Sequence, residues 1–505
     1  MRSDRAGARP AQSPAQPPRE AGSPPDAKRK LLWISLAACG SALLLAITNH
    51  ITQEVASVPF LWVLPLGLYL LSFVLCFEGG RWYRRDLFLR VLAVALGGMT
   101  YALLPAYAGL PLLLLVPLFC IGLFICCMFC HGELARLKPD PAHLTSFYLM
   151  LSLGGAIGAA LVALLAPHVF SGFYELQIAL GACAVLVYVV HRNDAEGPFR
   201  RQGSPLPLVG LAALVALFIV GLTFTVERQQ EQDRLSVRNF YGVLRVTDVN
   251  PSGAAAGGKA VGAGEGRYRR LVNGAIVHGL EFLAPGRRDR PTTYYGPDSG
   301  IGMALRAIEG TRPLRVAVIG LGAGTIAAYA QPADRYTFYE INPLDIRLVH
   351  TEFSFLGDST ARIRIVQGDA RLSLEREPPQ GFDVLAVDAF TGDSIPVHLL
   401  TIQAFRLYFH QLQPRGVLAV HISNRYLDLE PVVEAAAARL NKEAVEIENP
   451  DDHRNGIFKS LWILVGSRQG FLGQPAIEAA GSVLSPSQRD VLWTDDYSSL
   501  FRILK

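Results

Sequence analysis

The carboxyl-terminal half of this 505-residue chain contains no cysteine. All seven cysteines stand within the first 226 residues, as Cys39, Cys76, Cys120, Cys126, Cys127, Cys130 and Cys183. This absence excludes a disulfide from residues 227–505, which fits a cytosolic domain and does not exclude a periplasmic one. The grouping of Cys126, Cys127, Cys130 and His131 fits no ordinary zinc spacing, so we expect these residues to pack within an apolar segment and expect no metal.

Residues 227–505 also have no excess of positive or negative side chains. Of the 47 Lys/Arg and 43 Asp/Glu residues, 16 and 11 lie in residues 1–226, which leaves 31 and 32 for residues 227–505. The net charge of +4 therefore belongs to the first half. A nucleic-acid-binding domain usually carries a basic patch, so we expect no nucleic-acid partner and interpret the cations as determinants of membrane topology.

Apolar runs dominate the first half. After a tail at 1–30 that is rich in Pro, Ala, Ser and Arg and predicted to be disordered, seven runs have about the ~20 residues that a helix needs to cross a bilayer. They lie at 31–48, 58–77, 87–104, 108–130, 144–166, 173–191 and 206–226. The sequence thus predicts a multi-pass α-helical membrane domain over 31–226, with the lipid bilayer as its partner.

Lys and Arg are absent from the first, third and fifth connections between these runs, whereas the tail and the second, fourth and sixth connections contain them. The positive-inside rule then predicts a cytoplasmic N-terminus at the inner membrane. Seven spans would place residues 227–505 outside, which conflicts with a cytosolic nucleoside cofactor. Only failure of 206–226 to span would remove this conflict, so the side of the C-terminal domain is left open by the sequence.

Short strand patterns replace the apolar runs after residue 226. Residues 227–300 predict a linker and a small antiparallel β-domain, with a hairpin at Asn273-Gly274. Over 301–505, strands alternate with helices, which predicts an α/β doubly wound, methyltransferase-like Rossmann domain with a parallel sheet. The expected strands are 315–319, 336–340, 363–366, 383–387, 416–422 and 461–465.

A glycine-rich turn follows the first of these strands, at Gly320, Gly322 and Gly324. Dinucleotide folds have Gly-x-Gly-x-x-Gly, but Thr325 stands in the place of the third glycine, and the tighter spacing is typical of S-adenosyl-type folds. A helix is expected next, and Glu340 ends the second strand twenty residues after Gly320, where a ribose would present its hydroxyls.

Two further acids end strands of the same sheet. Asp369 follows the third strand in Gln367-Gly-Asp-Ala370, where an adenine amino group could be held, and Asp388 ends the fourth. Because the carboxyl ends of parallel strands meet at one edge, the sequence predicts a nucleoside site there with three carboxylates.

This order of motifs, continued by Val387-Asp-Ala-Phe-Thr-Gly-Asp-Ser-Ile-Pro396, resembles the spermidine synthase (polyamine aminopropyltransferase) family over about 235–505. The fusion to several spans resembles membrane-fused bacterial spermidine synthase-like proteins. The resemblance implies transfer of an aminopropyl group from decarboxylated S-adenosylmethionine to a small-molecule amine, without a metal. It also implies ribose binding by Glu340, adenine binding by Asp369 and Ala370, a reacting centre at Asp388, and a substrate-lining role for Tyr294 or Tyr295.

Two positions depart from the family. Ala323 stands where typical members have an aspartate that helps to hold the cationic substrate, and Thr391 stands where they have a second acid. Asp393 is the candidate to replace that catalytic acid, and Asp495 is a candidate to supply negative charge to the amine site.

The sequence leaves two other functions open. An S-adenosylmethionine-dependent methyltransferase on the same fold is favoured by Ala323 and Thr391. A transporter or sensor with a nucleoside- or polyamine-binding domain is a third alternative, although few ionisable residues lie inside the spans, which argues against proton-coupled transport. His278, His421 and His453 are weaker candidate bases. The sequence also leaves open whether the protein forms a homodimer.

Overall fold

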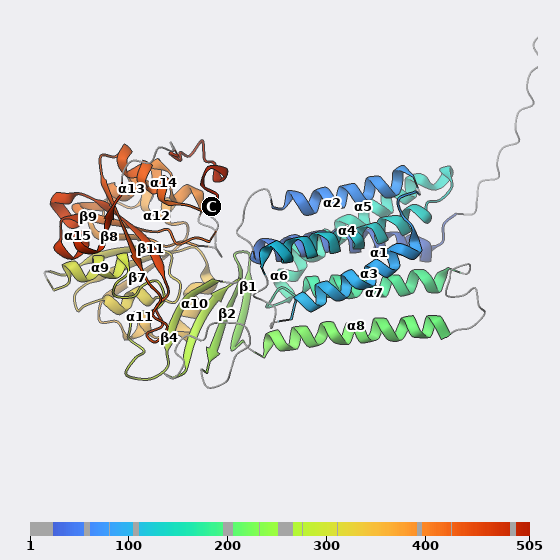
Figure 1. Ribbon diagram of the computed structural model, residues 1–505, viewed down its shortest axis with the longest axis horizontal. Helices are drawn as coiled ribbons and strands as arrows, with labels where there is room; N and C mark the ends of the chain where they lie inside the picture. The colour runs from blue at the N-terminus through green and yellow to red at the C-terminus, as the bar shows by residue number, and fades with distance from the viewer. Residues whose placement is uncertain are drawn as a thin grey trace, which may run out of the picture.

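The computed structural model consists of a helical bundle and an α/β part that lies at one end of it (Figure 1). The structure describes residues 24–54, 61–79, 81–104, 111–194, 206–231, 233–250, 266–274, 276–310, 312–390, 396–425, 427–484 and 491–505. Of the predicted site residues, Asp393 lies outside these ranges, as does Thr391.

Each of the seven apolar runs is largely helical. The helices are α1 (Ala27–Glu54), α2 (Val63–Glu78), α3 (Arg85–Ala102), α4 (Leu112–Arg136), α5 (Leu144–Ala160) continued by η3 (Leu161–Leu165) and α6 (Ala166–Val169), α7 (Glu175–Asn193) and α8 (Leu206–Gln230). Helix α1 packs against α4, α5 and α7, so it forms the centre of the bundle.

Five helical segments of the described chain are long and apolar enough to cross a membrane: 27–52, 113–136, 141–169, 175–193 and 206–228. Helix α2 has 16 residues, about 24 Å at 1.5 Å per residue, which is shorter than the ~30 Å hydrocarbon core. Helix α3 begins with Arg85 and Asp86. The membrane-type helices are therefore present, and the count of seven spans is not confirmed.

The ends of four helices meet at the end of the bundle that lies far from the α/β part (Figure 1). Arg29, near the start of α1, donates to the Leu137 carbonyl after α4 (3.0 Å). Arg85, at the start of α3, pairs with Glu133 of α4 (2.9 Å) and with Asp194 after α7. The N-terminal side of the bundle is thus opposite the α/β part.

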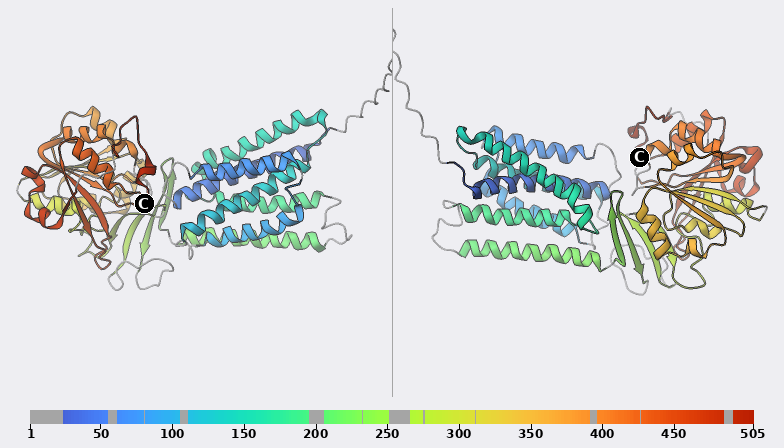
Figure 2. Two further views of the ribbon diagram at one scale, coloured as in Figure 1. Left: turned by 45° about the horizontal axis from the view of Figure 1, so that its top comes forward. Right: turned by 180° about the vertical axis from the view of Figure 1, so that it is seen from behind.

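A four-stranded antiparallel sheet with the order β1-β2-β3-β4 connects the bundle to the larger sheet (Figure 2). Its strands are β1 (Leu235–Asn239), β2 (Gly242–Val249), β3 (Tyr268–Asn273) and β4 (Ile276–Phe282). The expected antiparallel pairing is present, but residues 227–238, which we expected to be a linker, hold the end of α8 and most of β1.

Strand β1 is bound to the start of α7. The Arg238 guanidinium donates to both carboxylate oxygens of Glu175 (3.0 and 2.9 Å) and to the Gly172 carbonyl (2.8 Å). Both charged side chains are about 95% buried. This bidentate pair fixes the small sheet to the bundle.

The larger sheet has eight strands in the order β12-β10-β11-β9-β8-β5-β6-β7. They are β5 (Arg315–Ile319), β6 (Arg335–Glu340), β7 (Arg362–Gln367), β8 (Phe382–Val387), β9 (Leu412–His421), β10 (Glu443–Asn449), β11 (Ser460–Gly466) and β12 (Ser482–Val483). Strands β5 to β9 are parallel, as predicted.

The expectation of a wholly parallel sheet was wrong at its far edge. Strand β11, which contains the expected 461–465, runs antiparallel to both β9 and β10. The connection between β10 and β11 contains no helix. A parallel partner requires a longer crossover, so this short connection forces an antiparallel turn.

Helices cover both faces of the sheet, as a doubly wound fold requires. Ala317 and Ile319 of β5 pack in a core that includes residues of α12 (Ala370–Arg376), α13 (Ile402–Gln411) and α14 (Glu430–Arg439). Val316 and Val318 pack on the other face, in a core with residues of α9 (Gly300–Ile308) and α15 (Pro475–Ala480). Two more helices, α10 (Pro343–Glu352) and α11 (Phe355–Asp358), follow β6.

The α-helix expected directly after the glycine turn is absent. Residues Thr325–Tyr329 form only a short 3-10 helix, η4. Pro332 explains this difference, because proline has no N–H to continue a helix and its ring clashes with the preceding turn. The glycine turn itself is therefore not followed by an α-helix N-terminus that could hold a pyrophosphate, which is a further difference from a dinucleotide site.

Candidate active site

The glycine turn has backbone angles that only glycine adopts readily. Gly320, Gly322 and Gly324 have φ values of +98°, +51° and +76°. A Cβ on Gly320 would lie 2.3 Å from the Asp388 carbonyl oxygen, and one on Gly322 would lie 2.5 Å from that of His278. The turn thus brings β8 and β4 into contact with the end of β5.

A cleft opens at the carboxyl ends of the parallel strands, with an empty volume of about 880 Å³ that includes space open to solvent. This size is within the range of small-molecule sites. The predicted residues that line it are Tyr294, Gly320, Gly322, Glu340, Asp369, Ala370 and Asp388. Three predicted residues, Gly324, Tyr295 and Asp495, are not among its lining residues.

Glu340 is held by the backbone beside it. Its Oε2 accepts from the Leu321 N–H (3.0 Å) and its Oε1 from the Asn342 N–H (2.7 Å). Burial raises the pKa of this carboxyl, while the backbone hydrogen bonds act in the opposite direction. The two fixed oxygens keep lone pairs that a ligand's hydroxyl groups can donate to.

Asp345, which sequence reasoning missed, faces the same cleft from the first turn of α10. It is 6% exposed, and its buried Oδ1 has no hydrogen-bond partner within the described chain. Burial, followed by the charge of Glu340, raises its pKa well above the ordinary value, whereas the Gly322 N–H opposes this shift. A neutral Asp345 can donate a hydrogen bond to a ligand.

Asp388 has both carboxylate oxygens occupied by neighbouring side chains. Tyr295 donates its hydroxyl to Oδ2, and Nδ1 of His421 lies 2.7 Å from Oδ1. Burial, followed by the charge of Asp388, raises the pKa of Tyr295, which keeps its phenol protonated and able to donate. Asp388 is therefore a fixed carboxylate that still lines the cleft.

His421 is itself fixed between two aromatic rings. Its ring stacks on Tyr294 and on Trp462, with centroid distances of 4.6 Å in both cases. Its Nε2 lies 2.8 Å from Ser423 Oγ, which accepts from the Leu461 N–H. A carboxylate can only accept, so Nδ1 of His421 carries the proton that faces Asp388.

His278 adds a second unpartnered polar atom to the cleft. Its Nε2 is buried and has no hydrogen-bond partner in the described part of the chain. Burial lowers its pKa to about 4, so the ring is neutral near pH 7. Oδ1 of Asp345 and Nε2 of His278 are polar atoms that a bound ligand would satisfy.

Asp369 and Asp495 have their own partners. Asp369 caps α12 through the Leu372 N–H (2.9 Å), and its other oxygen lies 3.0 Å from Nε2 of His398, which also lines the cleft. Asp495 forms a bidentate pair with Arg371 (2.7 and 2.6 Å), which lowers its pKa. The charge of Asp495 is thus neutralised by an arginine and does not face the cleft.

Ala323 is not among the residues that line the cleft, and it packs against the small sheet. It is 1% exposed and packs with Leu244 and Leu271. A Cβ added to Gly279 of β4 would lie only 2.2 Å from the Ala323 Cβ. Strand β4 therefore occupies the space that a longer side chain at position 323 would need.

The small antiparallel sheet, the glycine turn and the strand-end acids define an α/β protein of the methyltransferase-like class. No family model matches the chain. It is similar to the polyamine aminopropyltransferase of Vibrio vulnificus (strain CMCP6), with 27% identity over 199 residues that cover 38% of this chain and 63% of that protein. The match thus spans less than two thirds of the relative's length.

The chain is also similar to solved structures of spermidine synthases. A probable spermidine synthase from Corynebacterium glutamicum ATCC 13032 has 20% identity and a TM-score of 0.40, covering 53% of this chain and 98% of that one. The spermidine synthase from Thermotoga maritima has 14% identity and a TM-score of 0.33, covering 52% and 82%. The similarity to the polyamine aminopropyltransferase of Vibrio vulnificus confirms the resemblance read from the motifs.

Proposed function

We propose that this protein is a membrane-anchored, spermidine synthase-like aminopropyltransferase that uses decarboxylated S-adenosylmethionine and an amine acceptor. One observation carries the proposal: Asp388 is fixed by Tyr295 and His421 in the same cleft as Glu340. The similarity to a polyamine aminopropyltransferase supports it.

In the proposed reaction, Glu340 accepts from the ribose hydroxyls and Asp369 from the adenine amino group. The neutral acceptor amine attacks the methylene carbon next to the sulfonium. The new C–N bond forms as the C–S bond breaks. The electron pair of the C–S bond stays on the sulfur, which leaves as methylthioadenosine. Asp388 orients the amine and accepts the proton that it loses, so catalysis comes from positioning and general base action.

The experiment uses the full chain in lipid nanodiscs. It is offered decarboxylated S-adenosylmethionine and putrescine, and methylthioadenosine is measured. We expect release that depends on the amine and is lost in Asp388→Asn, whereas Asp358→Asn keeps it, because Asp358 is an exposed partner of Arg288. Absence of methylthioadenosine from the wild type with any polyamine contradicts the proposal.

A methyltransferase on the same fold is the second candidate, and the buried Ala323 favours it. The acid that holds a cationic substrate in typical synthases is absent, and β4 occupies the adjoining space. The same assay with S-adenosylmethionine distinguishes the two, since this reading requires S-adenosylhomocysteine. Nucleoside or polyamine binding without either product would favour the transporter or sensor.

We also propose that the bundle spans the inner membrane and that the catalytic part faces the extracytoplasmic side, so the proposed reaction requires its adenosyl donor to be supplied on that side. Residues 206–228 of helix α8 form a 23-residue segment that is long and apolar enough to cross a membrane. This supports a seventh span, whereas a cytoplasmic C-terminal part would require this segment not to cross. Arg85 and Arg136 pair with Glu133, and Arg29 donates to the Leu137 carbonyl, all at the end of α4 that lies opposite the α/β part. The positive-inside rule assigns that end to the cytoplasm.

A further inference from the structure

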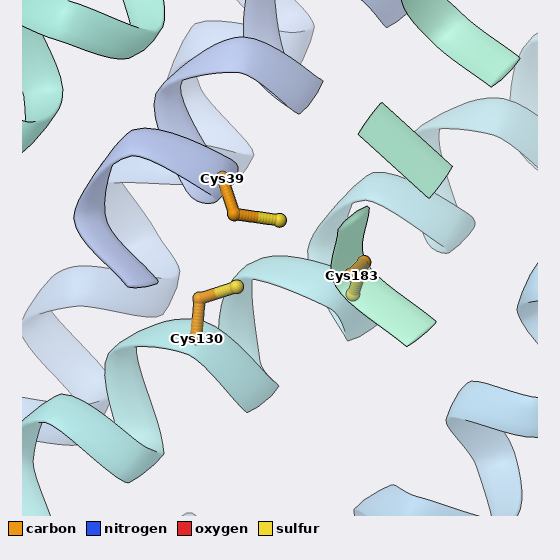
Figure 3. Close-up of side chains that lie close together, drawn as sticks. All are labelled: Cys39, Cys130 and Cys183. Carbon is orange, nitrogen blue, oxygen red and sulfur yellow. The ribbon is translucent and has the colours of Figure 1, made fainter. Parts of the chain in front are cut away.

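Three cysteines from three different helices meet inside the bundle. They are Cys39 of α1, Cys130 of α4 and Cys183 of α7, and their sulfur atoms all lie within 4.8 Å of one another (Figure 3). All three are buried, with exposures of 5%, 0% and 0%. Figure 3 shows their thiols pointing toward a common space. We propose that this cluster is a binding site for a soft, thiophilic metal ion, namely Cu(I).

The geometry fits a three-coordinate ion. A metal–sulfur bond of about 2.3 Å in a trigonal arrangement separates the sulfurs by about 4.0 Å, so small rotations of the thiols close the site. Cys39, Cys130 and Cys183 form the one such group of potential ligands among the described residues. Thiolates select Cu(I), zinc or iron–sulfur clusters, but structural zinc takes four ligands, so three sulfurs favour Cu(I).

A backbone-carbonyl contact does not distinguish the cluster, since Cys39 Sγ also lies 4.0 Å from the Ala179 oxygen, but Cys76 lies outside the group of three sulfurs. Its thiol donates to the Met128 carbonyl (3.7 Å) and contacts that residue's sulfur. The neighbouring His131 is also directed elsewhere, since its Nδ1 lies 3.0 Å from Ser72 Oγ on α2. Of the residues grouped in sequence at 126–131, only Cys130 belongs to the cluster. The other two ligands, Cys39 and Cys183, come from helices that are distant in sequence.

Charge limits the protonation state of the bound site. Each thiol that becomes a thiolate ligand releases one proton to solvent, so affinity falls as the pH falls. Two thiolates, one neutral thiol and Cu(I) carry a net charge of −1, which costs less in a low-dielectric interior than the −2 of three thiolates. The ion would link α1, α4 and α7 and so stabilise the centre of the bundle.

The test titrates the full chain, in detergent and under anaerobic reducing conditions, with Cu(I) in competition with the chromophoric chelator bathocuproine disulfonate. We expect one Cu(I) per chain and a loss of affinity of about tenfold or more in each of Cys39→Ser, Cys130→Ser and Cys183→Ser. Cys76→Ser and Cys120→Ser are the controls and should bind as the wild type does.

A second readout distinguishes lost ligands from lost folding. Cu(I) should raise the unfolding temperature of the wild type and of both controls, but not that of the three cluster variants, whose metal-free unfolding temperatures are measured alongside. Failure of the wild type to compete with the chelator overturns the proposal. Equal loss in the control variants, or stoichiometric binding of Zn(II) in place of Cu(I), also overturns it.

Discussion

Nδ1 of His421 lies 2.7 Å from Oδ1 of Asp388, and the two side chains are about 95% buried. The histidine ends β9 and the aspartate follows β8, so their contact comes from the parallel pairing of these strands. Tyr295 reaches the other oxygen from outside the sheet. The orientation of Asp388 therefore depends on residues from two other parts of the chain.

His421→Leu should lower kcat with little change in KM. Loss of the ring removes both the hydrogen bond to Asp388 and the stacking with Tyr294 and Trp462. Misplacement of a catalytic group can cost on the order of 100-fold, and we expect a loss of about 10- to 100-fold. Initial rates against amine concentration give both constants. The exposed His410 supplies the control His410→Gln, and an equal loss in that variant would remove the argument.

Ala323→Asp should not restore a typical synthase site. The new carboxylate would be buried against Leu244 and Leu271, next to Gly279. We expect a loss of about 1–3 kcal/mol in the free energy of unfolding and no gain in polyamine turnover. Ala333→Asp, at an exposed turn, is the matched control. Unchanged stability together with faster turnover would show that position 323 faces the substrate.

Asp345 should make the α/β part less stable as the pH rises. Its pKa is raised in the folded protein, so above the ordinary value of about 3.9 the unfolded chain loses this proton first. Within that window, stability falls by up to about 1.4 kcal/mol per pH unit until the folded group ionises. Asp345→Asn should make this slope shallower, measured as unfolding temperature between pH 5 and 8, while other buried carboxyls such as Glu340 and Glu281 keep part of it.

The exposed Asp358 again serves as the control for that experiment. Asp358→Asn should keep the pH dependence of the wild type. If Asp345→Asn keeps it as well, the carboxyl is ionised in the folded protein across this range, and its proposed donor role toward the ligand is lost.

The sequence predicted the strand-end acids because apolar strand patterns such as 315–319 and 383–387 mark buried parallel strands, and their last residues must meet at one edge. It could not predict the direction of β11, since a buried strand has the same pattern in either direction. Asp345 was missed because an acid in the first turn of a helix is ordinary capping chemistry. The cysteine cluster was missed because Cys39 and Cys183 are distant in sequence from Cys130.

Arg238→Ala should separate the small sheet from the bundle. Removing one partner leaves Glu175 buried and uncompensated, which typically costs about 3–5 kcal/mol. Faster proteolysis between α8 and β1, together with a lower unfolding temperature, would show that the small sheet has separated from the bundle. Arg228→Ala removes an exposed pair with Glu231 and should cost less than about 1 kcal/mol. The double variant with Glu175→Ala should recover part of the loss, and no recovery would mean that the pair does not hold the interface.

A reporter fused after Lys505 tests the proposed topology. Alkaline phosphatase, which is active outside the cytoplasm, should be active at this position, and a green fluorescent protein there should be dark. The same reporters placed between α4 and α5, next to Lys138, should give the opposite result because that connection shares the basic end of the bundle. Removal of residues 206–226 should reverse the signal at Lys505 alone. Cytoplasmic activity at Lys505 in the intact chain would mean that one helix of the bundle does not cross, and the adenosyl donor would then come directly from the cytosol.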